Sequence, residues 1–327
     1  MIPERALTLG LWALIGGFAL LAHVIGEAYW ITLANRAVVF AIAGVGLNLA
    51  LGNGGMVSFG HAAYFGIGGY VVGILATHAQ NFVPMFPDGL AIPGTQSMLV
   101  TWPLAVALGG LAALVIGALS LRTSGAYFIM ITLAFGQMFY YFAIAWTAYG
   151  GEDGISIWSR GTFPGVETLA PLPFFGLSYG VLTAVLLLVW ALNRSAFGLS
   201  LNAVRQAPER VETVGIAPFR LRLAAFVVSG MVTALAGALF ADLNRYVSPA
   251  LFSWTYSGEF IIFIVLGGIA RLMGPVVGAC VFVALESWLG ALSEYWLFYL
   301  GILLLGVVLF AKGGIVGALA RPGPGHA

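Results

Sequence analysis

AVVFAIAGVGLNLALGNGGMVSFGHAAYFGIGGYVVGIL, residues 37–75, is the stretch that decides the fold. It contains two long apolar runs, 37–51 and 59–75. The polar, glycine-rich residues 52–61 lie between them and overlap the start of the second run. Apolar runs of this length are typical of membrane-spanning helices. Residues 52–61 are too polar and too rich in glycine to continue a helix that faces lipid. They therefore predict a broken or re-entrant element within the membrane.

The composition of the whole chain agrees with a membrane protein. Of its 327 residues, 61% are hydrophobic and 8% are charged, whereas an ordinary soluble domain has about 25% charged residues. The apolar residues suffice for about ten spans of about 20 residues each. So few ionisable groups exclude a soluble enzyme, and a net charge of +1 provides no basic surface for nucleic acid.

Residues that carry catalytic or metal chemistry are scarce. The single cysteine, Cys280, cannot form an intrachain disulfide, and the four histidines have no zinc-ligand spacing. The single lysine, Lys312, is followed by glycine, so it does not form the Gly-Lys-Ser/Thr of a Walker A loop. We therefore expect a chain that is not an enzyme and holds no metal or cofactor. If ATP drives it, ATP and magnesium bind to another chain.

The apolar runs predict an all-α polytopic fold with eight to ten spans in a single transmembrane domain, residues 1–327. The first run resembles a signal peptide but lacks an Ala-x-Ala cleavage site, which favours an uncleaved helix. The run 258–269 is short for a complete crossing and fits a half-helix or a re-entrant element. Within a few residues, the expected spans are 8–25, 37–51, 59–75, 102–121, 126–145, 176–192, 224–241, 258–269, 275–292 and 295–311.

The distribution of basic residues predicts a cytoplasmic N-terminus. In that orientation only Arg36, Arg160 and Arg245 lie outside, and the other ten of the 13 basic residues lie inside: Arg5, Arg122, Arg194, Arg205, Arg210, Arg220, Arg222, Arg271, Lys312 and Arg321. Most acidic residues fall on the outer side or at its rim: Glu27, Asp88, Glu152, Asp153, Glu167, Asp242, Glu259 and Glu294. The reverse orientation would invert both distributions.

Two predicted external loops, 76–101 and 146–172, are too long to be simple turns. The first contains Pro84, Pro87 and Pro93. Each loop is either a docking site for a protein that delivers a solute or a solvated connector. Beyond the seventh span, Asp242 and Arg245 are expected to form a surface pair of little energetic weight.

Glycine supplies 45 residues, about twice its average share. Small residues allow membrane helices to approach closely, because lipid gives no hydrophobic drive for helix association. Residues 66–69, Gly274 and Gly278 are expected to have this packing role.

The longest predicted cytoplasmic loop, 193–223, is also the most charged part of the chain. Proline favours the first position of a helix and glycine the position after its last, so Pro208 and Gly215 bracket a predicted two-turn helix, Pro208–Val214. Val211 and Val214 are expected to share a face. Because so short a helix is unstable alone in water, one interpretation is that it docks on a partner protein. The other is a charged loop that merely follows the positive-inside rule.

A break at 52–61 would direct the N-terminus of a helix, with its free N–H groups, into the membrane interior, where an anionic solute group can bind. Ser58 is placed to cap a helix that begins near Phe59. The alternative is a tight turn that only packs two helices, with a structural histidine at 61. The residues that we predict to line a solute path are Asn53, Ser58 and His61, followed by the weaker candidates Asn48, Tyr64, Thr132 and Gln137.

One acidic residue, Glu286, falls well inside a predicted span, 275–292. An ionised residue near the bilayer centre costs about 2.5–3.5 kcal/mol on insertion scales, so such residues usually face a cavity or a partner helix. Glu286 therefore either contacts a solute amine or carries a proton, or it is hydrogen-bonded at an interface with a second permease.

Distinctive motifs occur from residue 37 to about residue 290. They are GLNL at 46–49, GNGGMVSFGHAAYFGIGGY at 52–70, RTSGAYF at 122–128, TLAFG at 132–136, GGEDGI at 150–155, AVRQAPERVETVGI at 203–216, LAAF at 223–226, ALAGAL at 234–239, YVSP at 246–249 and VLGG at 265–268 with GP at 274–275. This set resembles the signature of the branched-chain amino-acid ABC-transporter permeases, in particular the LivM-like subunit.

The resemblance implies a multi-subunit importer in a bacterial inner membrane. Such permeases pair with a second, LivH-like permease and two cytoplasmic ATPases, and a periplasmic binding protein delivers the solute. Arg210 and Val211 replace small residues of the family's acidic–Ala–Ala–x3–Gly pattern, which Glu209 and Gly215 match. By the resemblance, the short helix in 193–223 is a coupling helix that lies in a cleft of the ATPase, with contacts from Pro208, Glu209, Arg210, Glu212, Val214 and Gly215.

Two functions follow from these observations. The resemblance favours the permease subunit of an ABC importer for branched-chain amino acids or related small polar solutes. The alternative is a secondary transporter that a proton or sodium gradient drives through Glu286. Within the first, relatives are also associated with urea, short amides and organic acids, and the binding protein sets most of the selectivity.

Overall fold

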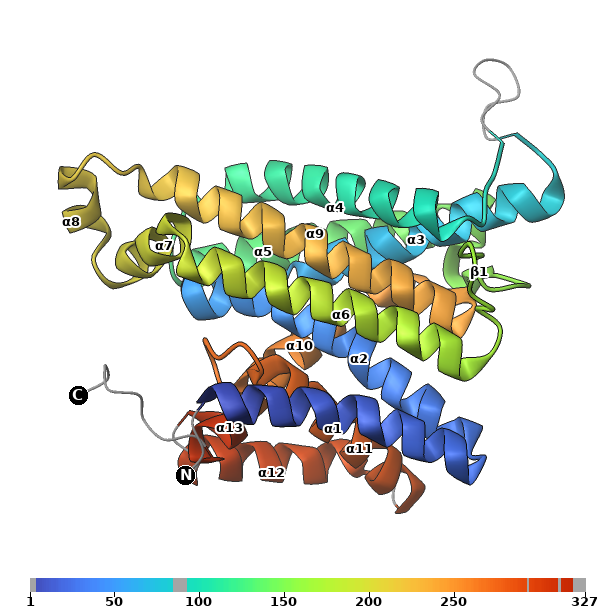
Figure 1. The fold of residues 1–327 in the computed structure, drawn as a ribbon. Helices are drawn as coiled ribbons and strands as arrows, with labels where there is room; N and C mark the ends of the chain where they lie inside the picture. The colour runs from blue at the N-terminus through green and yellow to red at the C-terminus, as the bar shows by residue number, and fades with distance from the viewer. Residues whose placement is uncertain (1–3, 85–92, 293, 311–312, 320–327) are drawn as a thin grey trace.

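The computed structural model describes residues 4–84, 93–292, 294–310 and 313–319, which form a bundle of long helices (Figure 1). Positions 85–92 of the first predicted external loop, with Pro87 and Asp88, and the predicted cytoplasmic residues Lys312 and Arg321 lie outside the described residues. The long helices are α1 (Glu4–Ile25), α2 (Ala28–Asn48), α3 (His61–Asn81), α4 (Met98–Ser120), α5 (Ala126–Ala145), α6 (Pro171–Arg194), α9 (Pro218–Asn244) and α11 (Gly274–Leu292).

Shorter elements connect these helices or complete the bundle. They are the π-helical turn η1 (Leu49–Asn53), the 3₁₀ turns η2 (Thr147–Tyr149), η3 (Gly151–Asp153) and η4 (Pro249–Phe252), and the helices α7 (Ala196–Gln206), α8 (Pro208–Thr213), α10 (Trp254–Gly267), α12 (Trp296–Phe310) and α13 (Gly314–Leu319). Two strands, β1 (Ile155–Ser156) and β2 (Tyr246–Val247), pair in antiparallel fashion, with Ile155 opposite Val247.

The predicted all-α polytopic fold is confirmed. In the described part of the chain, eight helices are long and apolar enough to cross a membrane, and α10 and α12 are shorter apolar helices. The second span begins nine residues earlier than predicted, at Ala28 instead of residue 37. Arg36 therefore lies inside a span, and its assignment to an external loop was wrong.

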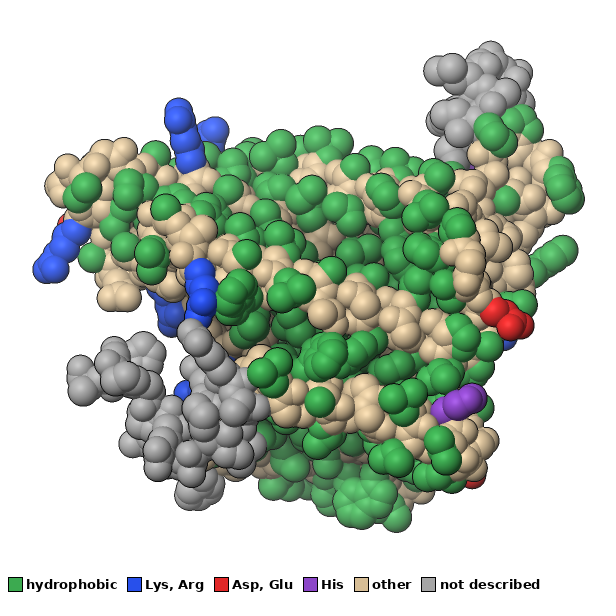
Figure 2. All heavy atoms as spheres, in the orientation of Figure 1, with side chains coloured by type: hydrophobic (Ala, Val, Ile, Leu, Met, Phe, Trp, Pro, Cys, Tyr) green, Lys and Arg blue, Asp and Glu red, His purple; other side chains and the backbone are tan. Residues whose placement is uncertain are grey.

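The two ends of the bundle differ in charge. One end, which we call the α8 end, carries α7, α8 and the starts of α1 and α9, whereas the β1 end carries β1 and the loop after α3 (Figure 1). On the face in Figure 2, hydrophobic side chains cover the length of the bundle, and most of the visible basic side chains lie at the α8 end. The predicted orientation rests on this asymmetry, with the α8 end in the cytoplasm.

Backbone contacts between helices hold the centre of the bundle. A Cβ atom at Gly68 of α3 would overlap the carbonyl of Ala234 in α9, and one at Gly237 of α9 would overlap the carbonyl of Phe65. A Cβ atom at Gly278 of α11 would overlap a carbonyl of α10 in the same way. Such contacts are possible only without side chains, so the predicted packing role of Gly68 and Gly278 is confirmed.

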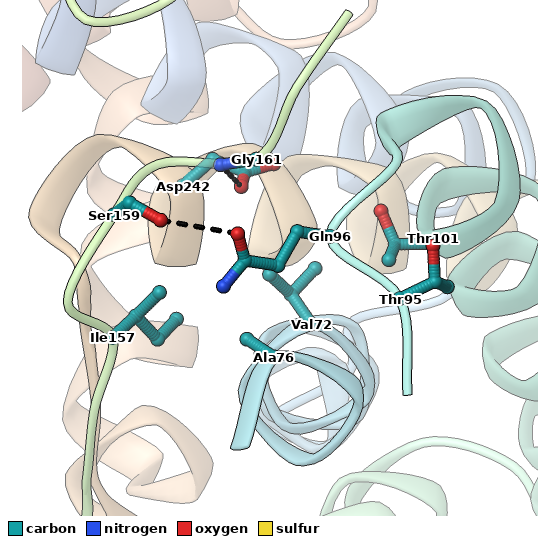
Figure 3. A pocket seen from close by; sticks show the side chains of 9 residues that line it. All are labelled: Val72, Ala76, Thr95, Gln96, Thr101, Ile157, Ser159, Gly161 and Asp242. Atoms are coloured by element: carbon teal, nitrogen blue, oxygen red, sulfur yellow. Dashed lines mark hydrogen bonds between the residues drawn. The ribbon is translucent and has the colours of Figure 1, made fainter. Parts of the chain in front are cut away.

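The second predicted external loop packs against the bundle through Asp242 (Figure 3). Asp242 is 1% exposed. Its carboxylate accepts hydrogen bonds from Trp102 Nε1 at 3.0 Å and from the backbone N–H of Gly161 at 3.3 Å. The expectation that Asp242 and Arg245 form a surface pair was therefore wrong. Because Asp242 lies in the last turn of α9, the loop can fold back over its carboxylate, beside a small pocket that Gln96 and Ser159 also line.

Arg160 fastens the same loop to the end of α9. Its guanidinium donates to the carbonyls of Asp242 at 2.9 Å, Thr168 at 2.6 Å and Leu243 at 3.3 Å, and it lies 4.2 Å from the ring centroid of Phe174. Burial lowers the pKa of the Arg160 guanidinium from its ordinary value, and the nearby charge of Asp242 opposes that change. The loop is thus a packed part of the β1 end, and its role as a docking site stays a prediction.

We expect Gly68→Val and Gly237→Val to lower the melting temperature of the detergent-solubilised protein by several degrees, because overpacking a closely packed interface costs about 1–3 kcal/mol. Gly180→Val in α6 is the matched control, since a Cβ there meets nothing within 4 Å. Fluorescence-detected thermal unfolding of the three variants measures the difference. Equal melting temperatures for all three would show that the α3–α9 contact does not limit stability.

Candidate functional site

The predicted break between the second and third spans is present. The π-helical turn η1 ends at Asn53, residues 54–60 are not helical, and α3 begins at His61. Gly55 has a φ of +69°, and a Cβ atom at Gly60 would lie 2.7 Å from the carbonyl oxygen of Thr132. Glycine is required at both positions, at the first by the backbone conformation and at the second by the neighbouring helix.

The break runs from the α8 end of the bundle into its interior. The side chain of Asn53 donates to Asn193 Oδ1 at 2.6 Å, and Asn193 lies in the last turn of α6. At the other end of the break, the N–H of Phe59 donates to Thr132 Oγ1 at 3.3 Å, in the second turn of α5. Non-helical backbone at membrane depth survives only against protein or a water-filled cavity, and here it lies against α5 and α6.

The start of α3 differs from the prediction by two residues. The hydroxyl of Ser58 accepts from the N–H of Gly60 at 3.2 Å, whereas the helix itself begins at His61. Ser58 therefore stabilises the last turn before the helix and does not cap it.

His61 is fully buried in a polar chain that joins α3, α9 and α2. Its Nε2 lies 2.7 Å from Ser229 Oγ, and the Ser229 hydroxyl donates to the carbonyl of Gly46 at 2.6 Å. A hydroxyl has one proton, so Ser229 accepts from His61 and the Nε2 atom carries the imidazole proton. The Nδ1 atom is buried with no hydrogen-bond partner among the described residues.

A second helix also begins inside the membrane. After β2, the chain turns back into the bundle through η4, where Phe252 stacks on Phe139 of α5 with ring centroids 6.0 Å apart. The 14-residue helix α10 then starts at Trp254 and runs to the α8 end. The position of α10 is consistent with the half-helix that was predicted for residues 258–269.

The starts of α3 and α10 meet. The N–H of Ala62, in the first turn of α3, donates to Ser257 Oγ of α10 at 2.8 Å. Ser253 accepts from the N–H of Thr255 at 3.4 Å and so caps α10. Trp254 is 54% exposed and Thr255 is also exposed. Two helix N-termini, one reached from each end of the bundle, thus lie side by side within the membrane, and that of α10 reaches the surface of this chain.

The structure brings together most of the residues that were predicted to line a path, but it buries them. Gln137, one turn and a residue beyond Thr132 on α5, is half-buried, and its amide nitrogen has no partner among the described residues. Glu286 is separate from this group, on α11. The residues near the break that are at most 5% exposed are Asn53, Ser58, His61, Tyr64 and Thr132.

The charged loop 193–223, which we call the coupling loop after its predicted role, has the predicted helix with one difference. Helix α8 ends at Thr213, one residue earlier than predicted, and Gly215 has a φ of +84°, as a glycine after a helix often has. Val211 is buried, whereas Val214 is 78% exposed, so the expectation that the two share a face was wrong. Val211 packs α8 onto its own chain, and the exposed residues of the helix are Pro208, Glu209, Arg210, Glu212 and Thr213.

Arg205 connects the coupling loop to the break. It lies in the last turn of α7, three residues before Pro208, and its Nη1 donates to the carbonyl of Gly52 in η1. A Cβ atom at Gly55 would lie 3.1 Å from Arg205 Cγ, so the two segments are also in van der Waals contact. Sequence reasoning missed this residue, because an arginine in a cytoplasmic loop already satisfies the positive-inside rule.

Asn48 extends the same connection to α10. Its amide nitrogen donates to the carbonyl of Arg271 at 3.0 Å, and its Oδ1 accepts from the N–H of Ala270 at 3.1 Å. Both partners belong to the short segment between α10 and α11. The break is therefore held on one side by the coupling loop and on the other by the end of the half-helix.

Known proteins resemble this chain along most of its length. The family described as "Branched-chain amino acid transport system / permease component" matches residues 29–308. The chain is 27% identical over 316 residues to the high-affinity branched-chain amino acid transport system permease protein LivM of Escherichia coli (strain K12), which covers 89% of this chain and 71% of LivM. No solved structure matches it.

A second group of relatives has a different name. The chain is 33% identical over 193 residues to the autoinducer 2 import system permease protein LsrC of Klebsiella pneumoniae, across 54% of this chain and 53% of LsrC. The family match contains both helix starts within the membrane and the whole coupling loop. The chain therefore belongs to the family of branched-chain amino acid transport permease components.

Proposed function

We propose that this chain is the permease subunit of an ABC importer for branched-chain amino acids, driven by ATP hydrolysis on two cytoplasmic subunits. The observation that carries the proposal is a hydrogen bond from the coupling loop to the turn that leads into the break. Arg205 donates to the carbonyl of Gly52 in η1. A transporter that an ion gradient drives has no need for an exposed helix tied to its intramembrane element. Family membership and the names of the LivM relatives support the same conclusion.

The proposed assembly contains four further chains around this one. A second, LivH-like permease covers the exposed start of α10, two ATPases bind the α8 ends of the two permeases, and a periplasmic binding protein docks at the β1 end. The N-terminus is then cytoplasmic in a bacterial inner membrane. The exposed residues of α8, with Val214 and Gly215 after it, supply the contact with the ATPase.

The proposed mechanism is a transfer of movement from α8 to the break. When ATP binding draws the ATPases together, α8 moves with them, and α7 moves because a single residue separates the two helices. Arg205 then pulls on Gly52, and Asn48 carries the displacement to the end of α10. The two helix starts separate or close, which exposes or buries the solute path between the permeases.

In this proposal, the buried path residues form the closed state of a gate. Asn53, Ser58, His61, Tyr64 and Thr132 are packed around the break, so a solute reaches them only when the break moves. Gln137 extends this polar group along α5. The LsrC relatives, whose name refers to autoinducer 2, make a different polar solute the second candidate.

The first test separates ATP-driven import from gradient-driven import. We expect vesicles with the complete assembly to accumulate leucine only when ATP is present on the α8 side, and a protonophore to leave the initial rate unchanged. Radiolabelled uptake is the measurement, with the permease pair without its ATPases as the control. Uptake by this chain alone that a protonophore abolishes would establish the secondary transporter instead.

The second test addresses Arg205. We expect Arg205→Ala to lower the number of leucine molecules imported per ATP hydrolysed by about tenfold, since loss of a charged hydrogen bond costs about 1.5–3 kcal/mol. ATP hydrolysis itself continues, because α8 is intact. Arg205→Lys should lower this ratio less. The control is Arg220→Ala, because Arg220 is an exposed arginine at the same end of the bundle. An unchanged ratio in Arg205→Ala would refute this connection.

The third test addresses the end of α8. Proline cannot adopt the positive φ of Gly215, so Gly215→Pro should distort the exposed surface after the helix and weaken co-purification of the ATPases at least several-fold. Gly165→Pro provides a control at the β1 end, where the glycine also has a positive φ, +77°, and an open surrounding. Quantitative pull-down in mild detergent compares the two. Equal recovery of the ATPases would place their contact elsewhere.

A further inference from the structure

Three ionisable side chains from three helices lie near one another inside the membrane, and two of them form an ion pair. Arg36 of α2 donates to Glu286 Oε1 of α11 at 2.8 Å. Glu259 of α10 lies close enough that the charges of both Glu286 and Arg36 act on it. Neither the break nor the coupling loop contains these residues, and we call them the charged triad.

The triad lies at membrane depth and not at the rim. Arg36 is eight residues beyond the start of α2 at Ala28, and Glu286 is six residues before the end of α11 at Leu292. At 1.5 Å per residue, these positions are about 12 Å and about 9 Å from the β1 end of their helices. Glu259 belongs to α10, which itself begins inside the membrane. Ionised groups at such depth face a protein partner or a water-filled cavity.

The triad has more acidic than basic groups and is not fully hydrogen-bonded. It has two carboxylates for one guanidinium. Glu286 Oε2 is buried without a hydrogen-bond partner, and in the described part of the chain no hydrogen bond or ion pair holds the carboxylate of Glu259. A guanidinium has five N–H donors, and the ion pair with Glu286 is the one hydrogen bond described for Arg36.

The triad is also accessible. The side chains of Arg36 and Glu286 are 35% and 22% exposed, and Glu259 is half-buried. Trp254 and Thr255, at the start of the same half-helix, are exposed as well. Ionisable side chains beside an exposed helix start are costly against lipid, so in the proposed assembly this surface borders the water-filled space between the two permeases.

We propose that the charged triad binds the head of an α-amino-acid zwitterion during its passage. The solute ammonium lies between Glu259 and the free oxygen of Glu286, and the solute carboxylate takes the unused N–H groups of Arg36. This inference rests on the proposed importer function and narrows its substrate class. An organic anion meets two carboxyl groups here, and urea or a short amide offers no charge to Glu259 or to the unused N–H groups of Arg36.

The competing explanation is a structural ion pair at the interface between the permeases. The pair Arg36–Glu286 would suffice for that purpose, and the exchange Arg36→Glu with Glu286→Arg would preserve it. A solute site would lose its function in the exchange, because the exchange moves each charge relative to Glu259 and to the start of α10. Glu259→Gln removes the carboxyl group of the triad that forms no ion pair within the described residues, and it keeps the shape of the side chain.

The test uses the complete assembly in vesicles, with ATP inside and leucine-loaded binding protein outside. We expect Glu259→Gln to lower initial leucine uptake by about tenfold, as the loss of one charge-assisted hydrogen bond would. Stimulation of ATP hydrolysis by the loaded binding protein should persist, because the coupling loop is intact. The double exchange should assemble in normal yield and import as slowly as Glu259→Gln, while Glu294→Gln, at an exposed position beyond α11, should import normally.

Different results would overturn different conclusions. Normal uptake by Glu259→Gln, or full recovery of uptake in the double exchange, would refute the solute site and leave the importer in place. A wild-type assembly that hydrolyses ATP but imports no leucine would refute both the zwitterion site and the amino-acid substrate. A wild-type assembly whose uptake ignores ATP would refute the proposed function itself.

Discussion

The structure depends on one constraint, which is that backbone polar groups within a bilayer must be satisfied by protein or by water. Within the described residues, two segments leave the helical conformation inside the membrane, and both pack against α5. The break at 54–60 lies against Thr132 of α5, and the return through η4 lies against Phe139 of the same helix. The Ser257 hydroxyl then accepts from the first turn of α3. The same constraint requires a cover for the exposed start of α10, and in the proposed assembly a second permease provides it.

Charge inside the bundle follows the same logic. Asp242 is buried, but Trp102 and Gly161 donate to it, and it anchors an external loop. The charged triad has fewer partners than it has polar atoms and remains accessible. A fully satisfied carboxylate fits a structural role, whereas an unsatisfied and accessible one fits a ligand. This contrast, within one chain, is the reason for assigning the solute head to Arg36, Glu259 and Glu286.

Sequence patterns located the spans well because lipid imposes long apolar runs on any helix that crosses it. They failed where polar residues occur inside a helix. Arg36 seemed to precede the second span, because the uninterrupted apolar run begins after it. The helix α2 nevertheless begins at Ala28. Asp242 seemed exposed because it is close to the end of a span. The interval of three between Val211 and Val214 was consistent with a shared face, but α8 ends at Thr213 and leaves Val214 in solvent.

By itself, the sequence determined that the chain is a helical membrane protein, where its helices break, and that its charged loop contains a short helix between proline and glycine. These features depend on local composition, because a helix that crosses lipid needs a long apolar run and because proline and glycine favour the ends of helices. The tertiary structure alone decided which polar groups meet. Arg205 and Gly52 are 153 residues apart, and Arg36 and Glu286 are 250 residues apart. No local pattern encodes such pairs, because they arise only when helices that are distant in the chain pack side by side.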